Sequence, residues 1–140
     1  MRKGDAMSER AAGSFEVKVT SQKPDTQIAR AASLGRLTID KRFHGDLEGT
    51  GKGEMLATQT DVPGSAGYVA MERVTGKLKG RAGGFVLQHS ATMTRGTPVS
   101  TITVVPDSGT GELHGISGRM TVTVGPEGGH TYEFDFRFEP

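Results

Sequence analysis

The chain of 140 residues contains no cysteine and no tryptophan. Without cysteine there is no disulfide, no thiolate metal site and no cysteine nucleophile. No apolar run approaches the roughly 20 residues of a membrane-spanning helix, and residues 1–14 lack the apolar core of a secretory signal. These absences predict a cytoplasmic protein that has no membrane partner.

The chain also lacks an excess of positive or negative charge. The 17 Lys and Arg residues nearly balance the 16 Asp and Glu residues, for a net charge of +1. Such a balance produces no extended positive field of the kind that attracts nucleic acid or anionic membranes. We therefore expect no nucleic-acid partner.

Glycine, in contrast, is plentiful, with 21 residues against only 6% aromatic residues, and this composition is typical of short strands joined by tight turns. From Phe15 onward apolar and polar residues alternate with period two. The pattern contains about eight strands at short, regular spacing. Only segment 25–34 has a helical composition, and it is short enough to be a loop.

This pattern predicts an all-β fold, either an antiparallel barrel or a sandwich, and the short turns favour a single eight-stranded up-and-down barrel. We expect a flexible tail over residues 1–14 and the barrel domain over residues 15–140. A barrel of eight strands has an interior that side chains fill or that holds one small ligand. On one face of segment 47–60, glycine recurs at Gly49, Gly51 and Gly53, which allows close approach or strong coiling of the sheet.

Two predicted strands each carry one ionisable residue on an otherwise apolar face. Glu72 interrupts the face of segment 68–78, and His89 interrupts that of segment 85–93. A turn centred on Gly80-Arg81 places Glu72 directly opposite His89, with Cβ atoms about 5 Å apart. A carboxylate and an imidazole inside an apolar surface can transfer a proton or orient a water molecule. We therefore predict Glu72 and His89 as catalytic residues, with either one as the base.

Three alternatives to this prediction remain open. The pair can be a structural ion pair that satisfies two buried groups, or the face can point outward. A slip of the turn by two residues makes Glu72 and His89 diagonal neighbours at about 7 Å, still within reach through a water molecule.

Five further residues are candidates for ligand binding: Tyr68, Lys41, Met55, Met93 and Phe134. Tyr68 shares the face of Glu72 and can present its hydroxyl to a ligand, although such tyrosines often belong to the core. Lys41 interrupts another apolar face, where a lysine usually extends to solvent; if buried, it is a candidate for binding a carbonyl or carboxylate. The methionines can line an adaptable pocket or simply pack, as can Met120.

No metal and no cofactor is predicted. The other histidines, His44, His114 and His130, lie among turn-like glycines without the spacing of a metal site. The run Gly109-Thr110-Gly111 is followed by no Gly-Lys-Ser/Thr and no helical pattern, so it does not predict a phosphate loop. A glycine-bent strand that closes the barrel is the better interpretation.

Several strings resemble the bacterial domain-of-unknown-function family 3224. They are GDLEGTG at 45–51, GEML at 53–56, GSAGYVA at 64–70 together with Glu72, GGFVLQHS at 83–90 and VVPDSGTGELHGISG at 104–118. The resemblance implies an eight-stranded barrel similar to allene oxide cyclase, and it implies no established activity. Cyclases with that barrel bind an apolar substrate inside it, so cyclase activity is an analogy at the level of the fold.

Three function classes follow. The first is an enzyme that binds an apolar or amphipathic small molecule in the barrel and isomerises or cyclises it with Glu72 and His89. The second is a binding module in which the pair only anchors a ligand. The third is a structural barrel filled by its own side chains. Under each, we expect a homo-oligomer with an interface at Val69, Met71 and Val86.

Overall fold

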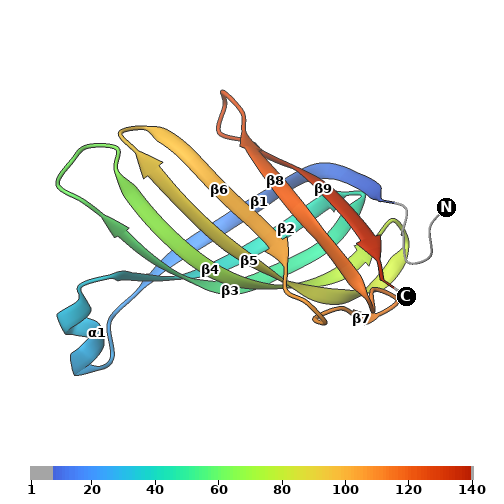
Figure 1. The fold of residues 1–140 in the computed structure, drawn as a ribbon, viewed down its shortest axis with the longest axis horizontal. Helices are drawn as coiled ribbons and strands as arrows, with labels where there is room; N and C mark the ends of the chain where they lie inside the picture. The colour runs from blue at the N-terminus through green and yellow to red at the C-terminus, as the bar shows by residue number, and fades with distance from the viewer. Residues whose placement is uncertain (1–7, 140) are drawn as a thin grey trace.

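The computed structural model describes residues 8–139 and consists almost entirely of strands (Figure 1). In chain order the elements are β1 (Glu9–Gln22), α1 (Gln27–Ala32), β2 (Gly35–Gly45), β3 (Leu47–Gln59), β4 (Ala66–Leu78), β5 (Arg81–Thr94), β6 (Thr97–Val104), β7 (Thr110–Gly111), β8 (Ile116–Val124) and β9 (His130–Phe138). Among the described residues there is no helix with the length and hydropathy to span a bilayer.

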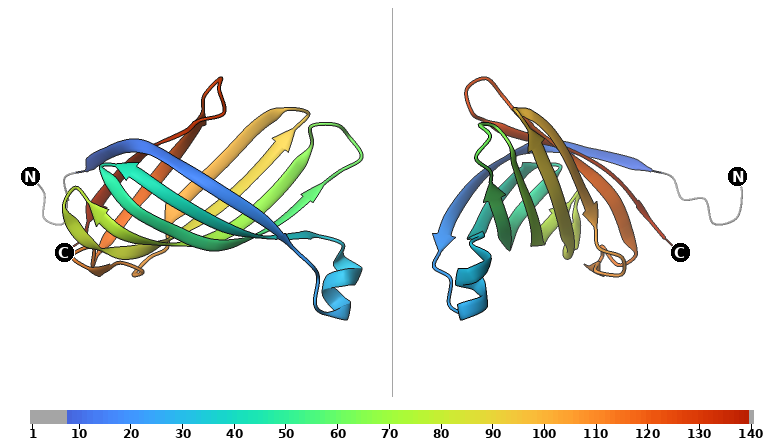
Figure 2. Two further views of the ribbon diagram at one scale, coloured as in Figure 1. Left: turned by 180° about the vertical axis from the view of Figure 1, so that it is seen from behind. Right: turned by 60° about the vertical axis from the view of Figure 1, so that its left-hand side comes forward.

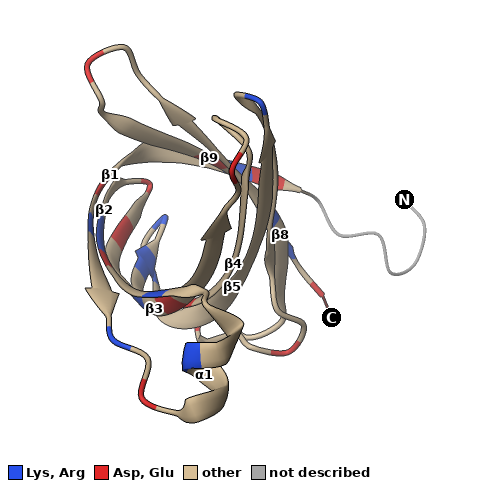
Figure 3. Ribbon diagram, turned by 90° about the vertical axis from the view of Figure 1, so that its left-hand side faces the viewer, with Lys and Arg blue, Asp and Glu red and all other residues tan. Residues whose placement is uncertain are grey.

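Eight of the strands form a closed antiparallel barrel. From β1 to β6, and then through β8 to β9, each strand pairs with the next, and β9 pairs with β1 to complete the ring (Figure 3). The two-residue strand β7 lies outside this ring and pairs with Gly83 and Gly84 of β5. The predicted all-β, up-and-down barrel is confirmed.

The barrel begins earlier in the chain than the sequence pattern indicated. Strand β1 starts at Glu9, which is paired with Phe136, and Ala11 is completely buried. The predicted tail is therefore wrong for residues 9–14, while residues 1–7 lie outside the described part of the chain. The small residues of segment 11–14 form no clear apolar alternation, and their strand structure comes from pairing with β9.

Segment 25–34 does contain a helix. The Thr26 hydroxyl accepts a hydrogen bond from the Ala29 backbone N–H at 3.0 Å, which caps the start of α1. Ser33, in the left-handed conformation with φ of 56°, ends it. The helix has no buried residue and links β1 to β2 at one end of the barrel (Figure 2).

The β4–β5 hairpin has a tighter turn than predicted. Leu78 pairs with Arg81, so the loop is only Lys79-Gly80, with φ of 47° and 86°. Two successive positive φ values are the signature of the type I′ turn, whose twist matches that of the strands. Glu72 consequently lies opposite Leu87, and His89 lies opposite Ala70. The predicted register was wrong by two residues.

The packed core occupies one half of the barrel, towards the β4–β5 turn. Phe85, Phe134 and Phe136 stack there, with ring centroids 5.5 and 5.3 Å apart. Leu113, from the loop after β7, is 1% exposed and belongs to the same cluster. The glycine-rich segment before it contains β7, which lies outside the ring, and leads the chain to this buried leucine; the barrel wall is closed by β9 and β1 and not by residues 109–111.

Candidate functional site

A cluster of three ionisable side chains lies in the middle of the barrel interior. Lys41 on β2, Glu72 on β4 and His89 on β5 are 7%, 0% and 4% exposed. One carboxylate oxygen, Glu72 Oε1, accepts hydrogen bonds from Lys41 Nζ at 3.0 Å and from His89 Nε2 at 2.9 Å. The diagonal offset of Glu72 and His89 thus brings their side chains into direct contact.

A glycine on the strand between them lets Glu72 reach Lys41. Strand β3 separates β2 from β4, and Gly51 is paired with both Lys41 and Val74. The Glu72 carboxylate lies directly above Gly51, where an added Cβ would overlap Oε2. Any larger residue at this position therefore displaces the carboxylate.

The environment keeps Glu72 ionised. Burial alone would raise the pKa of Glu72, but the hydrogen bond from His89 and the charge and hydrogen bond of Lys41 outweigh it, so the pKa lies below its ordinary value. The second oxygen, Oε2, is sealed from solvent and has no hydrogen-bond partner among the described residues. The cluster therefore holds a buried carboxylate through one oxygen only.

The cluster separates the packed core from an open cavity. Beyond it in one direction, Val74, Leu78 and Phe85 are completely buried. In the other direction lies a cavity of about 320 Å³ to which all eight barrel strands contribute. The lining residues are Phe15, Val17, Val19, Ile39, Lys41, Met55, Tyr68, His89, Ser100, Ile102, Val122, Val124 and His130.

This cavity reaches the mouth of the barrel and the seam between β6 and β8. A neighbouring hollow of about 300 Å³ shares Met55, Tyr68 and Ser100 with it and extends to Met93. Strands β6 and β8 pair only at residues 102–103 with 119–120. Ser100 on β6 and Val124 on β8 line the cavity beyond this short pairing, where the two strands have no backbone pairing with each other. The cavity that Lys41 and His89 line is therefore open at the mouth and borders this gap in the β6–β8 pairing.

Most of the predicted ligand-binding residues lie along this cavity. Tyr68 and Met55 line it, and Met93 lies at the mouth with 42% of its surface exposed. Burial raises the pKa of the Tyr68 hydroxyl, and the charge of Glu72 adds to the shift. Phe134 instead lies completely buried in the packed core, so its assignment to the ligand site was wrong. The alternation of apolar and polar residues showed which side chains of the strand point into the barrel. It did not show which of them line the cavity and which belong to the packed core.

Lys41 also departs from the usual behaviour of lysine. It does not extend to solvent, because Glu72 supplies a buried counterion and the Phe15 ring centroid lies 4.7 Å from Nζ. The sequence showed an apolar face interrupted by lysine, but its partner lies two strands away. In the sequence, only the alternate glycines of β3, which allow close approach, indicated that a side chain of β4 could reach Lys41 across that strand.

Sequence reasoning missed His130. Its ring stacks on Phe15 with centroids 4.9 Å apart, and it lines the cavity. The signal was available, since His130 continues by one step the inward series that begins at Tyr132.

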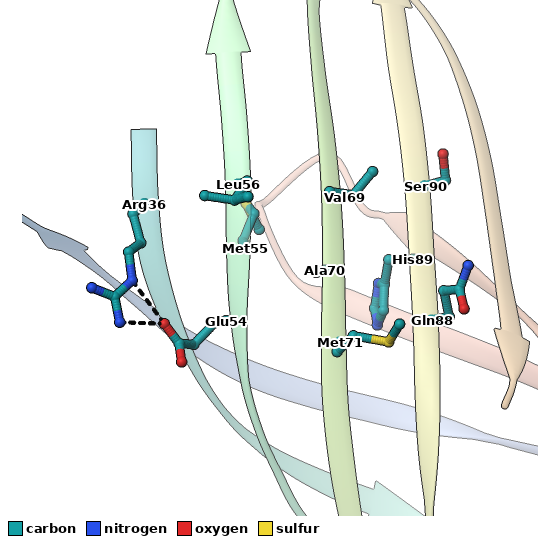
Figure 4. A pocket seen from close by; sticks show the side chains of 10 residues that line it. All are labelled: Arg36, Glu54, Met55, Leu56, Val69, Ala70, Met71, Gln88, His89 and Ser90. Atoms are coloured by element: carbon teal, nitrogen blue, oxygen red, sulfur yellow. Dashed lines mark hydrogen bonds and ion pairs between the residues drawn. The ribbon is translucent and has the colours of Figure 1, made fainter. Parts of the chain in front are cut away.

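The outer wall carries a separate hollow, a groove of about 440 Å³ over β3, β4 and β5 (Figure 4). Leu56, Val69 and Met71 line it with about half of their surfaces exposed, at 46%, 53% and 52%. Arg36 and Glu54, paired at 2.9 Å, lie at its rim. The self-association expected at Val69, Met71 and Val86 stays a prediction.

Comparison with known proteins agrees with this architecture. A family model described as "Protein of unknown function (DUF3224)" matches residues 11–136. This chain belongs to that family. It is similar to the crystal structure of a protein with unknown function from the DUF3224 family of Shewanella oneidensis MR-1, at 46% sequence identity and a TM-score of 0.88, with 96% of this chain and 99% of that chain covered. No protein with a curated description matches.

The DUF3224 match confirms the family resemblance seen in the sequence. The family description names no ligand and no reaction.

Proposed function

We propose that this barrel binds an apolar or amphipathic small molecule in its interior and catalyses proton transfer on it, as in an isomerisation or cyclisation. The supporting observation is the polar cluster at the base of an apolar cavity of about 320 Å³. Binding sites for small molecules are typically concave and apolar, with a few polar groups that fix orientation. The valine and isoleucine walls suit the body of the ligand, and Lys41 and His89 suit its polar end.

The catalytic part of the proposal depends on His89. A carboxylate that accepts a hydrogen bond from one ring nitrogen orients the imidazole and stabilises its protonated form. Glu72 is related to His89 in this way, at 2.9 Å. His89 is therefore the base or acid, and Glu72 is the residue that positions it.

Binding is tested by NMR of the methionine methyl groups. The probes are 2-decanone, 1-decanol and decanoate, which share an apolar chain and differ in the polar group. Met55 lines the cavity and Met93 lies at its mouth, whereas Met71 lies on the outer wall and Met120 in the core. We expect saturable shifts at Met55 and Met93 and none at Met71. Shifts confined to Met71, or no shift with any probe, would contradict interior binding.

A matched pair of variants localises the effect. Val122→Trp fills the cavity from β8, whereas Thr121→Trp places the same side chain on the exposed outer face of that strand. We expect the first to abolish the Met55 shift and the second to preserve it. Equal binding by the two variants would exclude this cavity as the site.

A further inference from the structure

Two features of the cluster define the chemistry that it can perform, and the first is the free nitrogen of His89. An ionised carboxylate only accepts hydrogen bonds, so the contact with Glu72 Oε1 makes His89 Nε2 the donor. In the neutral imidazole, the other nitrogen, Nδ1, then carries a lone pair. Among residues 8–139, Nδ1 has no hydrogen-bond partner and is not among the sealed polar atoms. Because His89 lines the cavity, this lone pair is available to a ligand there.

The second feature is the unused donor capacity of Lys41. An ammonium group has three N–H donors, and within the described chain Lys41 uses one, to Glu72. The rings of Phe15 and Phe43, at 4.7 and 5.6 Å from Nζ, hold the cation in place. Since Lys41 also lines the cavity, it presents a fixed positive charge beside His89.

A base next to a fixed cation suits proton abstraction at a carbon adjacent to a carbonyl group. When that proton leaves, negative charge develops on the carbonyl oxygen, and a donor fixed in an apolar site stabilises it strongly. We propose that the substrate is an apolar ketone or enone, that His89 Nδ1 removes the proton, and that Lys41 Nζ donates a hydrogen bond to the carbonyl oxygen. This inference rests on the proposed function and adds the substrate class and the role of Lys41.

The step is balanced without another reactant. The C–H bond next to the carbonyl breaks, its proton goes to His89 Nδ1, and its electron pair forms the C=C bond of an enolate while the C=O π electrons move to oxygen. Return of the proton to the same carbon exchanges hydrogen. Return to the far carbon of a conjugated enolate shifts the double bond and gives an isomer.

Charge favours a neutral carbonyl over a carboxylate ligand. A base is neutral before it takes up a proton, so in the reactive form the cluster contains one carboxylate and one ammonium group, which balance each other. A second carboxylate would lie near Glu72 in an apolar cavity, where repulsion between like charges is strong. A ketone brings an acceptor oxygen without a charge, so it uses the free donors of Lys41 at no such cost.

The decisive experiment follows 2-decanone in D₂O with the wild-type protein. We expect deuterium to enter the positions next to the carbonyl at least about 100-fold faster than with free imidazole at equal concentration, since general-base catalysis and a fixed donor each contribute factors of this order. We also expect the ¹³C signal of the bound carbonyl to move downfield. Exchange no faster than with imidazole overturns the inference, and so does a bound carbonyl signal that stays unchanged.

Variants separate the two roles. His89→Gln keeps a donor to Glu72 but removes the base, so it should lose about 100-fold in exchange rate while the carbonyl shift remains. Lys41→Met should lose the carbonyl shift together with the exchange. Binding of 2-decanone at Met55 without exchange refutes this inference and leaves the proposed binding function intact. Absence of binding by all three probes refutes both.

Discussion

Lys41 Nζ and Glu72 Oε1 lie 3.0 Å apart, although β2 and β4 are separated in the barrel wall by β3. The contact passes over Gly51, where no side chain intervenes. Gly51 therefore leaves the space through which the Glu72 carboxylate reaches Lys41. Substitution of Gly51 measures how much this space contributes to stability.

Gly51→Ala should destabilise the protein by about 1–3 kcal/mol, the usual cost of inserting a methyl group into a packed interior. The new Cβ overlaps Glu72 Oε2, which is sealed from solvent, so the carboxylate must shift and disturb the hydrogen bonds that Oε1 accepts from Lys41 and His89. Urea unfolding measures the change. Gly67→Ala on β4 is the control, because its Cβ would meet only ordinary contacts at 3.7 and 3.9 Å. Equal stability of the two variants would show that the carboxylate moves freely.

Glu72→Gln should cost about 3–5 kcal/mol at neutral pH, because it leaves the Lys41 ammonium buried without a counterion. Glu54→Gln, which breaks the exposed pair with Arg36, should cost less than about 1 kcal/mol. Denaturant midpoints at pH 7 measure both. A similar small loss in the two variants would mean that the buried carboxylate contributes no more than a surface one.

The stability contributed by Glu72 should also depend on pH. The folded-state pKa of Glu72 is lowered, so its contribution is complete above the unfolded value of about 4.3 and is lost as pH falls through the folded pKa. The difference in unfolding free energy between wild type and Glu72→Gln should therefore be largest near neutral pH and shrink below about pH 4. A difference that stays constant down to pH 3 would contradict an ionised Glu72.

Tyr132→Phe should destabilise the barrel by about 1–3 kcal/mol. The Tyr132 hydroxyl accepts a hydrogen bond from the Leu47 N–H at 2.9 Å, and its single O–H donates to the carbonyl oxygen of His44 or of Leu47, at 2.9 and 3.2 Å, so the substitution removes these buried and half-buried contacts. Tyr68→Phe is the control, because within residues 8–139 its hydroxyl makes no hydrogen bond. Thermal unfolding compares the two, and an equal shift in Tm would refute the role of Tyr132.

Two substitutions in the β4–β5 turn should change the stability of the protein in opposite directions. Gly80→Ala should lower stability by about 1 kcal/mol, because φ of 86° is strained for any residue with a Cβ. Lys79→Asn should raise it by several tenths of a kcal/mol, since asparagine tolerates the positive φ of the first turn position. A Cβ at residue 80 would meet nothing within 4 Å, so the effect isolates backbone strain. Thermal unfolding of both variants provides the test.

The same hairpin shows how far the sequence could predict the site. Alternation placed Glu72 and His89 on inward faces of adjacent strands, and both are buried in the interior. It did not determine the loop, because Gly80-Arg81 and Lys79-Gly80 are both plausible turn centres. The error of two residues preserved the faces, since side chains alternate with period two, but it changed opposite neighbours into diagonal ones.

Lys41 and Phe134 show what the alternation could not predict, namely how deep in the barrel each inward side chain lies. Each lies on a strand whose inward face was recognised, and both were candidates for ligand binding, Lys41 on the condition that it is buried and does not extend to solvent at the rim. Lys41 is buried in the cluster, and Phe134 lies in the packed core. Depth along a barrel depends on the stagger between strands, which no single strand encodes.

The sequence by itself determined the all-β class, the number of barrel strands, the inward faces and the presence of ionisable groups on them. These properties follow from local alternation and turn residues, which act within a few positions. Only the tertiary structure decided that Lys41, Glu72 and His89 share one carboxylate oxygen at the boundary between core and cavity. That contact needs closure of the barrel, the stagger of three strands and the space above Gly51, and these arise only when distant segments pair.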